Sequence, residues 1–149
     1  MPETDTSAKN PLHVSEVDDN LKELSPHGSF ELPVETYTGN CEIFHALYDH
    51  WHSEMEIMYI EKGSGFARLN RESIRLKKGD ILIVNCGVLH SMRTDLNNPL
   101  YYKSVVFGLG FLAGQPGDIC QECVVSPLME NRAEFCHHIE EGDSGYEKL

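Results

Sequence analysis

A short polar segment in the middle of the chain combines residue types that bind metal ions. It reads His50-Trp51-His52-Ser53-Glu54-Met55-Glu56, so imidazoles and carboxylates alternate with other side chains. On an extended strand alternate side chains project to one face, and we therefore expect His50, His52, Glu54 and Glu56 to share a face. Neutral imidazole and carboxylate groups suit divalent transition metals such as Zn, Ni, Mn or Fe. The segment predicts a metal site; a solvated strand edge that carries the same residues without a metal is the alternative.

A second segment places another histidine at a defined distance from glycines. The first segment continues to Gly63 as H-x-H-x(3)-E-x(6)-G, and the second runs from Gly79 to His90 as G-x(5)-N-x-G-x(2)-H. Glycine adopts positive φ angles without steric cost, so these positions indicate tight turns. We expect the turns after Gly79 to return His90 to the face that carries the first segment.

These two segments resemble the two motifs of the cupin superfamily, whose members are jelly-roll β-barrels. In that superfamily two histidines and a glutamate from the first motif and one histidine from the second bind a metal ion. The resemblance implies that four residues hold a metal or an organic ligand here: His50, His52, Glu56 and His90. Phe44, Asn85 and Thr94 depart from the family pattern, but their positions shape turns and leave the ligand set intact.

A narrower resemblance extends over most of the chain. His27-Gly28-Ser29, the stretch from His50 to Gly65 and the stretch from Leu76 to Asn85 are similar to the effector-binding domain of AraC-type transcription regulators. Pro127-Leu128 and Ser144-Gly145-Tyr146-Glu147 also match motifs of that family. There the last motif opens a helix that leads to dimerisation and linker segments and then to a pair of helix-turn-helix motifs. We expect this chain to be the sensor without that DNA-binding part.

The resemblance implies a non-enzymatic domain that binds a small polar effector, such as a sugar, inside the barrel and forms a homodimer in the full regulator. A stand-alone cupin metalloenzyme, a dioxygenase or an isomerase, is the alternative, because both classes share the two motifs. A scaffold that dimerises without a ligand is a third reading, and it predicts a collapsed, apolar barrel interior.

Composition excludes several other classes. The chain has 149 residues, the size of one domain, and a formal net charge of −12. Nucleic acids and anionic membrane surfaces attract basic proteins, so we expect this chain to bind neither. The N-terminus lacks the basic and apolar regions of a signal peptide, and five cysteines are an odd number. A reducing cytoplasm is therefore the expected location.

Turn residues divide the chain into elements. We expect an N-terminal arm over residues 1–29 with a short helix around Ser15–Leu24, an all-β barrel over 30–141, and the start of a linker or dimerisation helix over 142–149. Short runs rich in β-branched and aromatic residues alternate with turns and predict a closed antiparallel architecture. The expected strands are Val34–Tyr37, Ile43–Tyr48, Met55–Ile60, Gly65–Leu69, Ser73–Leu76, Ile81–Val84, Ser91–Thr94 and Tyr101–Phe107.

The last third of the chain carries a second group of potential metal ligands. Cys120 and Cys123 have the spacing of a zinc knuckle, with Cys136-His137-His138 farther on. The second half lacks a spaced pair, so we expect instead small buried cysteines on a helix over Asp118–Val125 that Pro127 ends. A final strand is expected over Phe135–Ile139.

Two residues beside the first motif are expected to have structural roles. His45 and Trp51 would alternate away from the ligand face of an unbroken strand.

Overall fold

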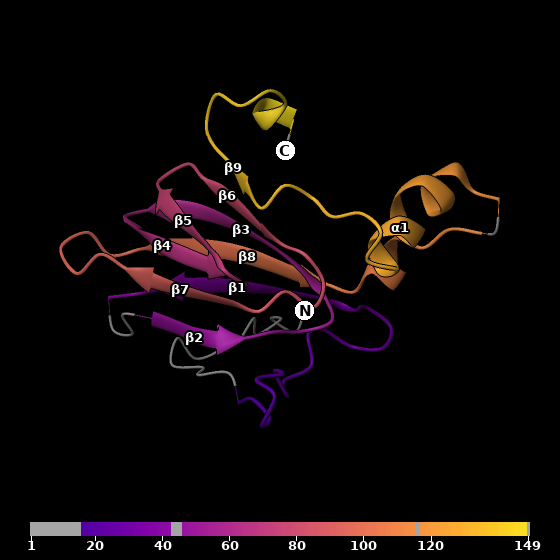
Figure 1. Ribbon diagram of the computed structural model, residues 1–149, viewed down its shortest axis with the longest axis horizontal. Coiled ribbons are helices and arrows are strands. Elements are labelled where there is room, and N and C mark those ends of the chain that lie inside the picture. The colour runs from indigo at the N-terminus through magenta and orange to yellow at the C-terminus, as the bar shows by residue number, and fades with distance from the viewer. Residues whose placement is uncertain (1–15, 43–45, 116, 149) are drawn as a thin grey trace, which may run out of the picture.

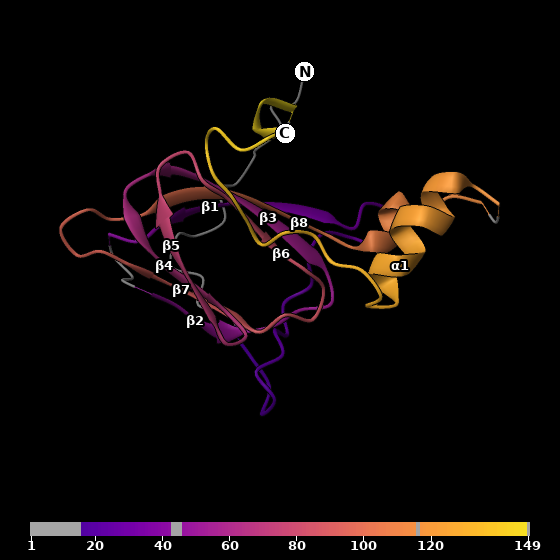
Figure 2. The same cartoon turned by 45° about the horizontal axis from the view of Figure 1, so that its top comes forward.

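Two antiparallel sheets face each other and enclose the core. The computed structural model describes residues 16–42, 46–115 and 117–148. The larger sheet has the order β1-β8-β3-β6-β9 and the smaller has the order β2-β7-β4-β5. Figures 1 and 2 show the two layers, with the helical segment at one end of them. The strands are β1 (Val34–Asn40), β2 (Ala46–His50), β3 (Met55–Lys62), β4 (Ser64–Leu69), β5 (Glu72–Lys77), β6 (Ile81–Val84), β7 (His90–Thr94), β8 (Tyr101–Phe107) and β9 (His138–Ile139).

Alternation along the strands builds the core between the sheets. In β4, Gly65, Ala67 and Leu69 are buried while their neighbours are not, which is the period of a half-buried strand. Leu76 of β5 and Met58 of β3 join the same core. The expected strands are thus confirmed to within a few residues, except that residues 43–45 of the second one lie outside the described residues.

The N-terminal segment does not form the expected helix around Ser15–Leu24. Ser15 lies outside the described residues, and the chain after it makes a reversal in which Val17 pairs with Glu23. Asp18 Oδ1 accepts hydrogen bonds from the backbone amides of Asn20 and Lys22. An aspartate that bonds nearby amides favours a turn over a helix, so the helix prediction was wrong.

The segment that follows β8 packs against one end of the outer face of the larger sheet. Leu109 and Leu128 are buried against Met55 and Ile83. Pro127 does not end the helix as expected: a π-helical turn, η2 (Gln121–Val125), continues directly into α1 (Ser126–Met129). Pro127 lies in the first turn of α1, directly after the π-helical turn.

The remaining C-terminal elements are short. The expected strand over Phe135–Ile139 is confirmed only for His138 and Ile139, which pair with β6 as β9. Tyr146–Lys148 forms a single 3-10 turn, η3. Four residues, Leu109–Leu112, form the 3-10 helix η1 after β8. In the part of the chain described here, no helix is long and apolar enough to cross a lipid bilayer.

Candidate metal centre

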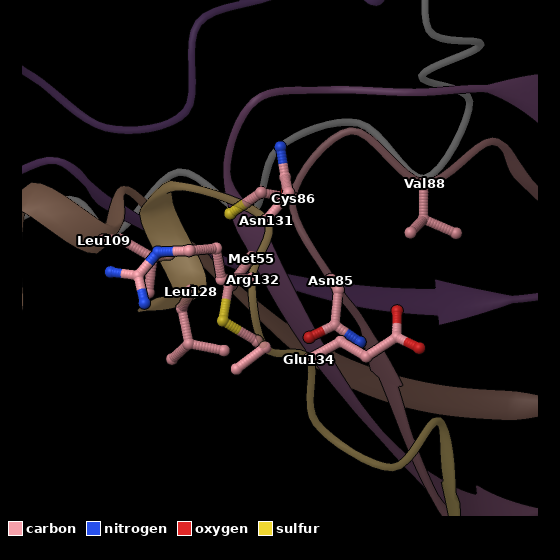
Figure 3. A pocket seen from close by; sticks show the side chains of 10 residues that line it. Met55, Asn85, Cys86, Val88, Leu109, Leu128, Asn131, Arg132 and Glu134 are labelled. Atoms are coloured by element: carbon pink, nitrogen blue, oxygen red, sulfur yellow. The ribbon is translucent and has the colours of Figure 1, made fainter. Parts of the chain in front are cut away.

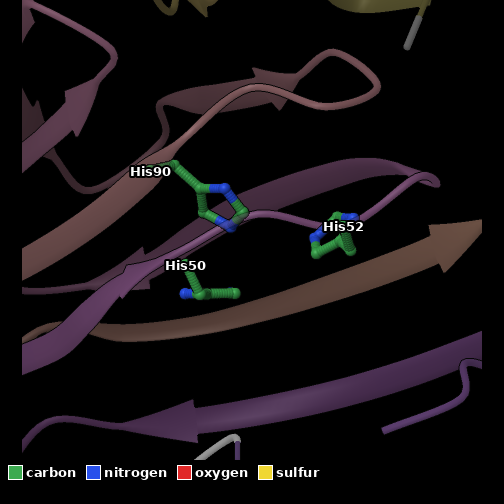
Figure 4. Close-up of side chains that lie close together, drawn as sticks. All are labelled: His50, His52 and His90. Carbon is green, nitrogen blue, oxygen red and sulfur yellow. The ribbon is translucent and has the colours of Figure 1, made fainter. Parts of the chain in front are cut away.

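Three histidines converge at one end of the barrel from separate elements. His50 is the last residue of β2, His52 lies in the connection to β3, and His90 is the first residue of β7. Figure 4 shows the three rings turned toward one another. Glu56, the second residue of β3, joins them from the opposite sheet. All four residues that the resemblance implied as ligands are therefore brought together.

The expected reason for this convergence was wrong. We expected His50, His52, Glu54 and Glu56 to lie on one face of a single strand. The chain instead crosses from the smaller sheet to the larger one between His50 and Met55, so His50 and Glu56 belong to different sheets. The crossing, and the pairing of His50 with His90 across β2 and β7, bring the side chains together.

The ligand atoms lie at short distances from one another. Nitrogens of His50, His52 and His90 all lie within 4.8 Å of each other. Glu56 Oε2 lies 3.4 Å from His52 Nε2 and 3.5 Å from His90 Nε2. Metal–ligand bonds of about 2.0–2.2 Å place two ligands of one ion roughly 3 to 4.3 Å apart, and both Glu56 distances fall in this range.

Backbone carbonyls fix the orientation of each imidazole. Nδ1 of His50 lies 2.8 Å from the carbonyl of Tyr48, and Nδ1 of His90 lies 2.9 Å from that of Val88. Nδ1 of His52 lies 3.1 Å from the carbonyl of Glu54. A carbonyl can only accept, so each Nδ1 carries the proton, and in the neutral ring Nε2 then presents a lone pair. This is the arrangement in which imidazoles bind metals.

With the protons on Nδ1, the Nε2 lone pairs of His52 and His90 face the carboxyl group of Glu56, so hydrogen-bond acceptors lie opposite one another. Burial raises the pKa of Glu56, but its contacts with His52 and His90 outweigh burial and hold that pKa well below its ordinary value. Glu56 is 6% exposed, and its Oε2 faces the Nε2 atoms of both rings. His90 Nε2 is buried without a hydrogen-bond partner among the described residues. A proton on Glu56, a second proton on an imidazole or a metal ion would make this arrangement favourable.

Protonation of an imidazole is opposed by its burial. Burial lowers the pKa of His50, and the charge of the neighbouring His90 lowers it further. Burial opposes charging of an imidazole in general, whereas a metal ion binds neutral rings. The donor set thus fits a divalent transition metal.

Sequence reasoning missed three further residues beside the centre: Glu23, His27 and Tyr37. Glu23 Oε2 lies 3.1 Å from His27 Nε2 and 3.9 Å from His50 Nε2, and His27 Nδ1 lies 2.7 Å from the Tyr37 hydroxyl. Burial lowers the pKa of His27, but the hydrogen bond and charge of Glu23 outweigh it and raise the pKa overall. His27 was marked only by the family resemblance, and Glu23 stands in a segment without any periodicity.

Other residues singled out in the sequence lie outside the centre. Glu54 is partly exposed, and its carboxylate faces His52 Nδ1 at 3.9 Å rather than Nε2. Trp51 points away as expected, and its Nε1 donates to the carbonyl of Asn20. His45 lies outside the described residues. Cys120 and Cys123 are exposed, so the expectation of buried cysteines was wrong.

A second group of potential ligands is already balanced by a lysine. Asp80, His138 and Glu140 lie close together at the end of the larger sheet. The Lys77 ammonium pairs with Glu140 and lies 3.4 Å from Asp80 Oδ1. It supplies the positive charge that a metal ion would bring.

A cavity of about 320 Å³ lies between the barrel end and the C-terminal segment (Figure 3). Its walls include Met55, Cys86 and Val88 on one side and Leu128 and Arg132 on the other. None of the four convergent residues lines it, so it is a feature separate from the candidate metal centre.

Comparison with solved structures supports the fold. A cupin protein from Bacteroides fragilis superposes with a TM-score of 0.50 over 58% of this chain and 75% of its own, at 22% identity. The expected cupin-type jelly-roll architecture is confirmed, and this likeness concerns the fold alone.

Comparison with known sequences identifies the family. An uncharacterized HTH-type transcriptional regulator, YdeC of Bacillus subtilis, is 42% identical over 76 residues, which are 50% of this chain and 26% of that protein. An acireductone dioxygenase of Tuber melanosporum is 39% identical over 64 residues, 40% of this chain and 36% of the enzyme. The chain thus spans about a third or less of these relatives. The family model of the AraC-like ligand binding domain matches residues 13–142. With its cupin-type barrel, the chain belongs to the AraC-like ligand binding domain family.

Proposed function

We propose that this chain is the effector-sensing domain of an AraC-type transcription regulator and that it holds a divalent transition metal at His50, His52, Glu56 and His90. The observation that carries the proposal is the set of inward lone pairs around the buried Glu56. Zn, Ni, Mn and Fe are the candidate ions, since imidazole and carboxylate suit all of them.

The interior of the barrel limits where an effector can bind. One part is filled by apolar side chains such as Ile60, Leu76 and Leu100, each fully buried. The polar groups are gathered at the other part, around the histidines. This division favours a small polar effector that reaches the metal with a donor oxygen or nitrogen, rather than a molecule that fills the barrel. It also disfavours a scaffold with a wholly apolar interior.

In this proposal the chain's own residues bind and orient. The metal would supply a Lewis-acidic position for a polar atom of the effector. The backbone carbonyls of Tyr48, Glu54 and Val88 hold the imidazole rings, and the buried Glu56 compensates part of the ion's charge. In the same proposal, self-association and the control of DNA-binding domains are functions of a full-length AraC-type regulator.

Metal content tests the proposal. Purified protein would be exposed to each candidate ion, passed over a desalting column and measured by mass spectrometry. We expect about one equivalent in the wild type and in His137→Ala, which removes a histidine outside the centre, and a large loss in His52→Ala. Equal metal in both variants, or none in the wild type, would contradict the proposal.

The acireductone dioxygenase relatives favour one second candidate, a metal-dependent oxygenase. Oxygen uptake by the Fe²⁺-loaded chain in the presence of acireductone distinguishes the two. We expect no uptake above that of His52→Ala; catalytic uptake that this substitution abolishes would favour the enzyme.

A further inference from the structure

A second buried carboxylate reaches the histidines from the N-terminal segment. The Glu23 side chain is 5% exposed, and its Oε2 lies 3.9 Å from His50 Nε2. That separation is too long for a hydrogen bond but lies within the roughly 3 to 4.3 Å expected between two ligands of one metal ion. Glu23 and His52 also offer ligand atoms within 4.8 Å of each other.

His27 lies in the same place, but its ring is fully engaged. Nε2 contacts Glu23 Oε2 at 3.1 Å, and Nδ1 contacts the Tyr37 hydroxyl at 2.7 Å. A carboxylate only accepts, so Nε2 donates its proton to Glu23 in either protonation state of the ring. His27 therefore has no lone pair directed at the centre, and its contact fixes the direction of the Glu23 carboxylate.

We propose that Glu23 is a fifth protein ligand of the metal ion and that His27 and Tyr37 position its carboxylate. The inference rests on the proposed metal centre and adds a ligand that lies outside both sequence motifs. Ligating carboxylates are commonly held by a hydrogen-bond donor behind them, as His27 holds Glu23. Two carboxylates, Glu23 and Glu56, also match the charge of a divalent ion.

The backbone beside Glu23 is attached to the barrel next to the histidines. The Glu23 amide donates to the Trp51 carbonyl at 2.9 Å, and the Trp51 amide donates to the Leu21 carbonyl at 3.0 Å. Trp51 stands between His50 and His52 in the chain. A bond from Glu23 to the metal would therefore couple metal binding to the attachment of residues 21–23. Lys22 is exposed in this stretch, so trypsin cleavage after it reports the coupling.

Glu54 provides a matched control for Glu23. Both carboxylates have Oε2 at 3.9 Å from a ring nitrogen of a central histidine. Glu54 faces His52 Nδ1, whose proton already binds a carbonyl, whereas Glu23 faces the lone pair of His50 Nε2. Glu23→Gln and Glu54→Gln remove the same charge near the centre, and Glu23→Gln also alters the contact with His27 that is proposed to orient the ligand.

The experiment measures Zn²⁺ affinity by competition with a chromophoric chelator and the rate of trypsin cleavage after Lys22, with and without Zn²⁺. We expect Glu23→Gln to weaken Zn²⁺ binding about 10- to 100-fold and to lose the zinc-dependent protection of Lys22. Glu54→Gln should change the affinity less than about threefold and keep the protection. Thermal unfolding of the zinc-free proteins checks that both variants fold.

Glu56→Gln separates the two proposals. If the wild type binds no Zn²⁺, or if Glu56→Gln binds it as well as the wild type, the metal centre itself is wrong. If Glu56→Gln loses Zn²⁺ while Glu23→Gln behaves like Glu54→Gln, the centre stands and the fifth ligand is refuted.

Discussion

Proton positions on the histidines decide what the centre can bind. His50 and His90 each direct Nδ1 to the carbonyl two residues earlier, at 2.8 Å and 2.9 Å, and this local contact fixes the ring before any metal arrives. His52 makes the equivalent contact with the carbonyl two residues later. Because the orientation is set locally, little rearrangement is needed on binding, which lowers the entropic cost of forming the site.

Metal affinity should depend on pH because protonated imidazole cannot ligate. The ordinary pKa of histidine is about 6.5, so we expect Zn²⁺ to be released as the pH falls from about 7 to 5 and rebound when it is restored. Since burial and His90 lower the pKa of His50, that residue stays neutral below the ordinary value and does not begin the release. Dialysis at stepped pH with zinc analysis measures the curve. Unchanged zinc content at pH 5 would exclude imidazole ligands.

Strands were predictable because turn residues mark their ends. Gly63 adopts φ +86° between β3 and β4, and Asn70 adopts φ +51° between β4 and β5, conformations that glycine and asparagine favour. Gly79 has φ +92° just before β6. Local chemistry of this kind is readable from the sequence, and it located the barrel strands closely.

Contacts between residues of different sheets or distant segments could not be predicted from the local sequence. The alternation rule grouped His50 with Glu56, although a change of sheet after His50 separates them. Glu23 was missed because its place in the centre depends on pairing with Trp51, 28 residues later in the chain, which no local pattern shows. Family resemblance named the four residues that the fold brings together, where strand parity supplied the wrong reason.

Gly63, in the turn that joins β3 of one sheet to β4 of the other, should tolerate substitution poorly. A Cβ there would lie 1.9 Å from the Pro99 carbonyl oxygen, in addition to the strain of its positive φ. Gly87 has φ +71° and open space around it. We expect Gly63→Ala to destabilise the protein by at least about 2 kcal/mol and Gly87→Ala by about 1 kcal/mol. Urea unfolding of the two variants compares them; equal losses would show that the contact with Pro99 relaxes freely.

At the scale of the whole molecule, the residues that form the apolar core are different from those that form the candidate metal centre. Residues between the two sheets, such as Met58, Leu69 and Met92, form the apolar core, whereas the acidic and imidazole groups gather where the chain crosses between sheets. The N-terminal segment lies against that crossing through its contacts with Trp51 (Figure 1). A site at such a junction is placed where binding can affect the attachment of the segment.

The net charge of −12 predicts how the whole chain behaves toward DNA. Phosphate backbones repel an acidic protein, so we expect no sequence-selective binding of duplex DNA at about 0.15 M salt. Fluorescence anisotropy with the duplex upstream of the chain's own gene measures this. Saturable binding that weakens steeply with added salt would overturn the prediction.

X-ray absorption at the edge of the bound metal tests the central claim most directly. Protein loaded with one equivalent of Zn²⁺ should show nitrogen and oxygen neighbours at about 2.0–2.1 Å, with the outer scattering of imidazole rings, and lose that pattern in His52→Ala. Sulfur neighbours at about 2.3 Å would place the ion on cysteine thiolates and contradict the assignment to His50, His52, Glu56 and His90.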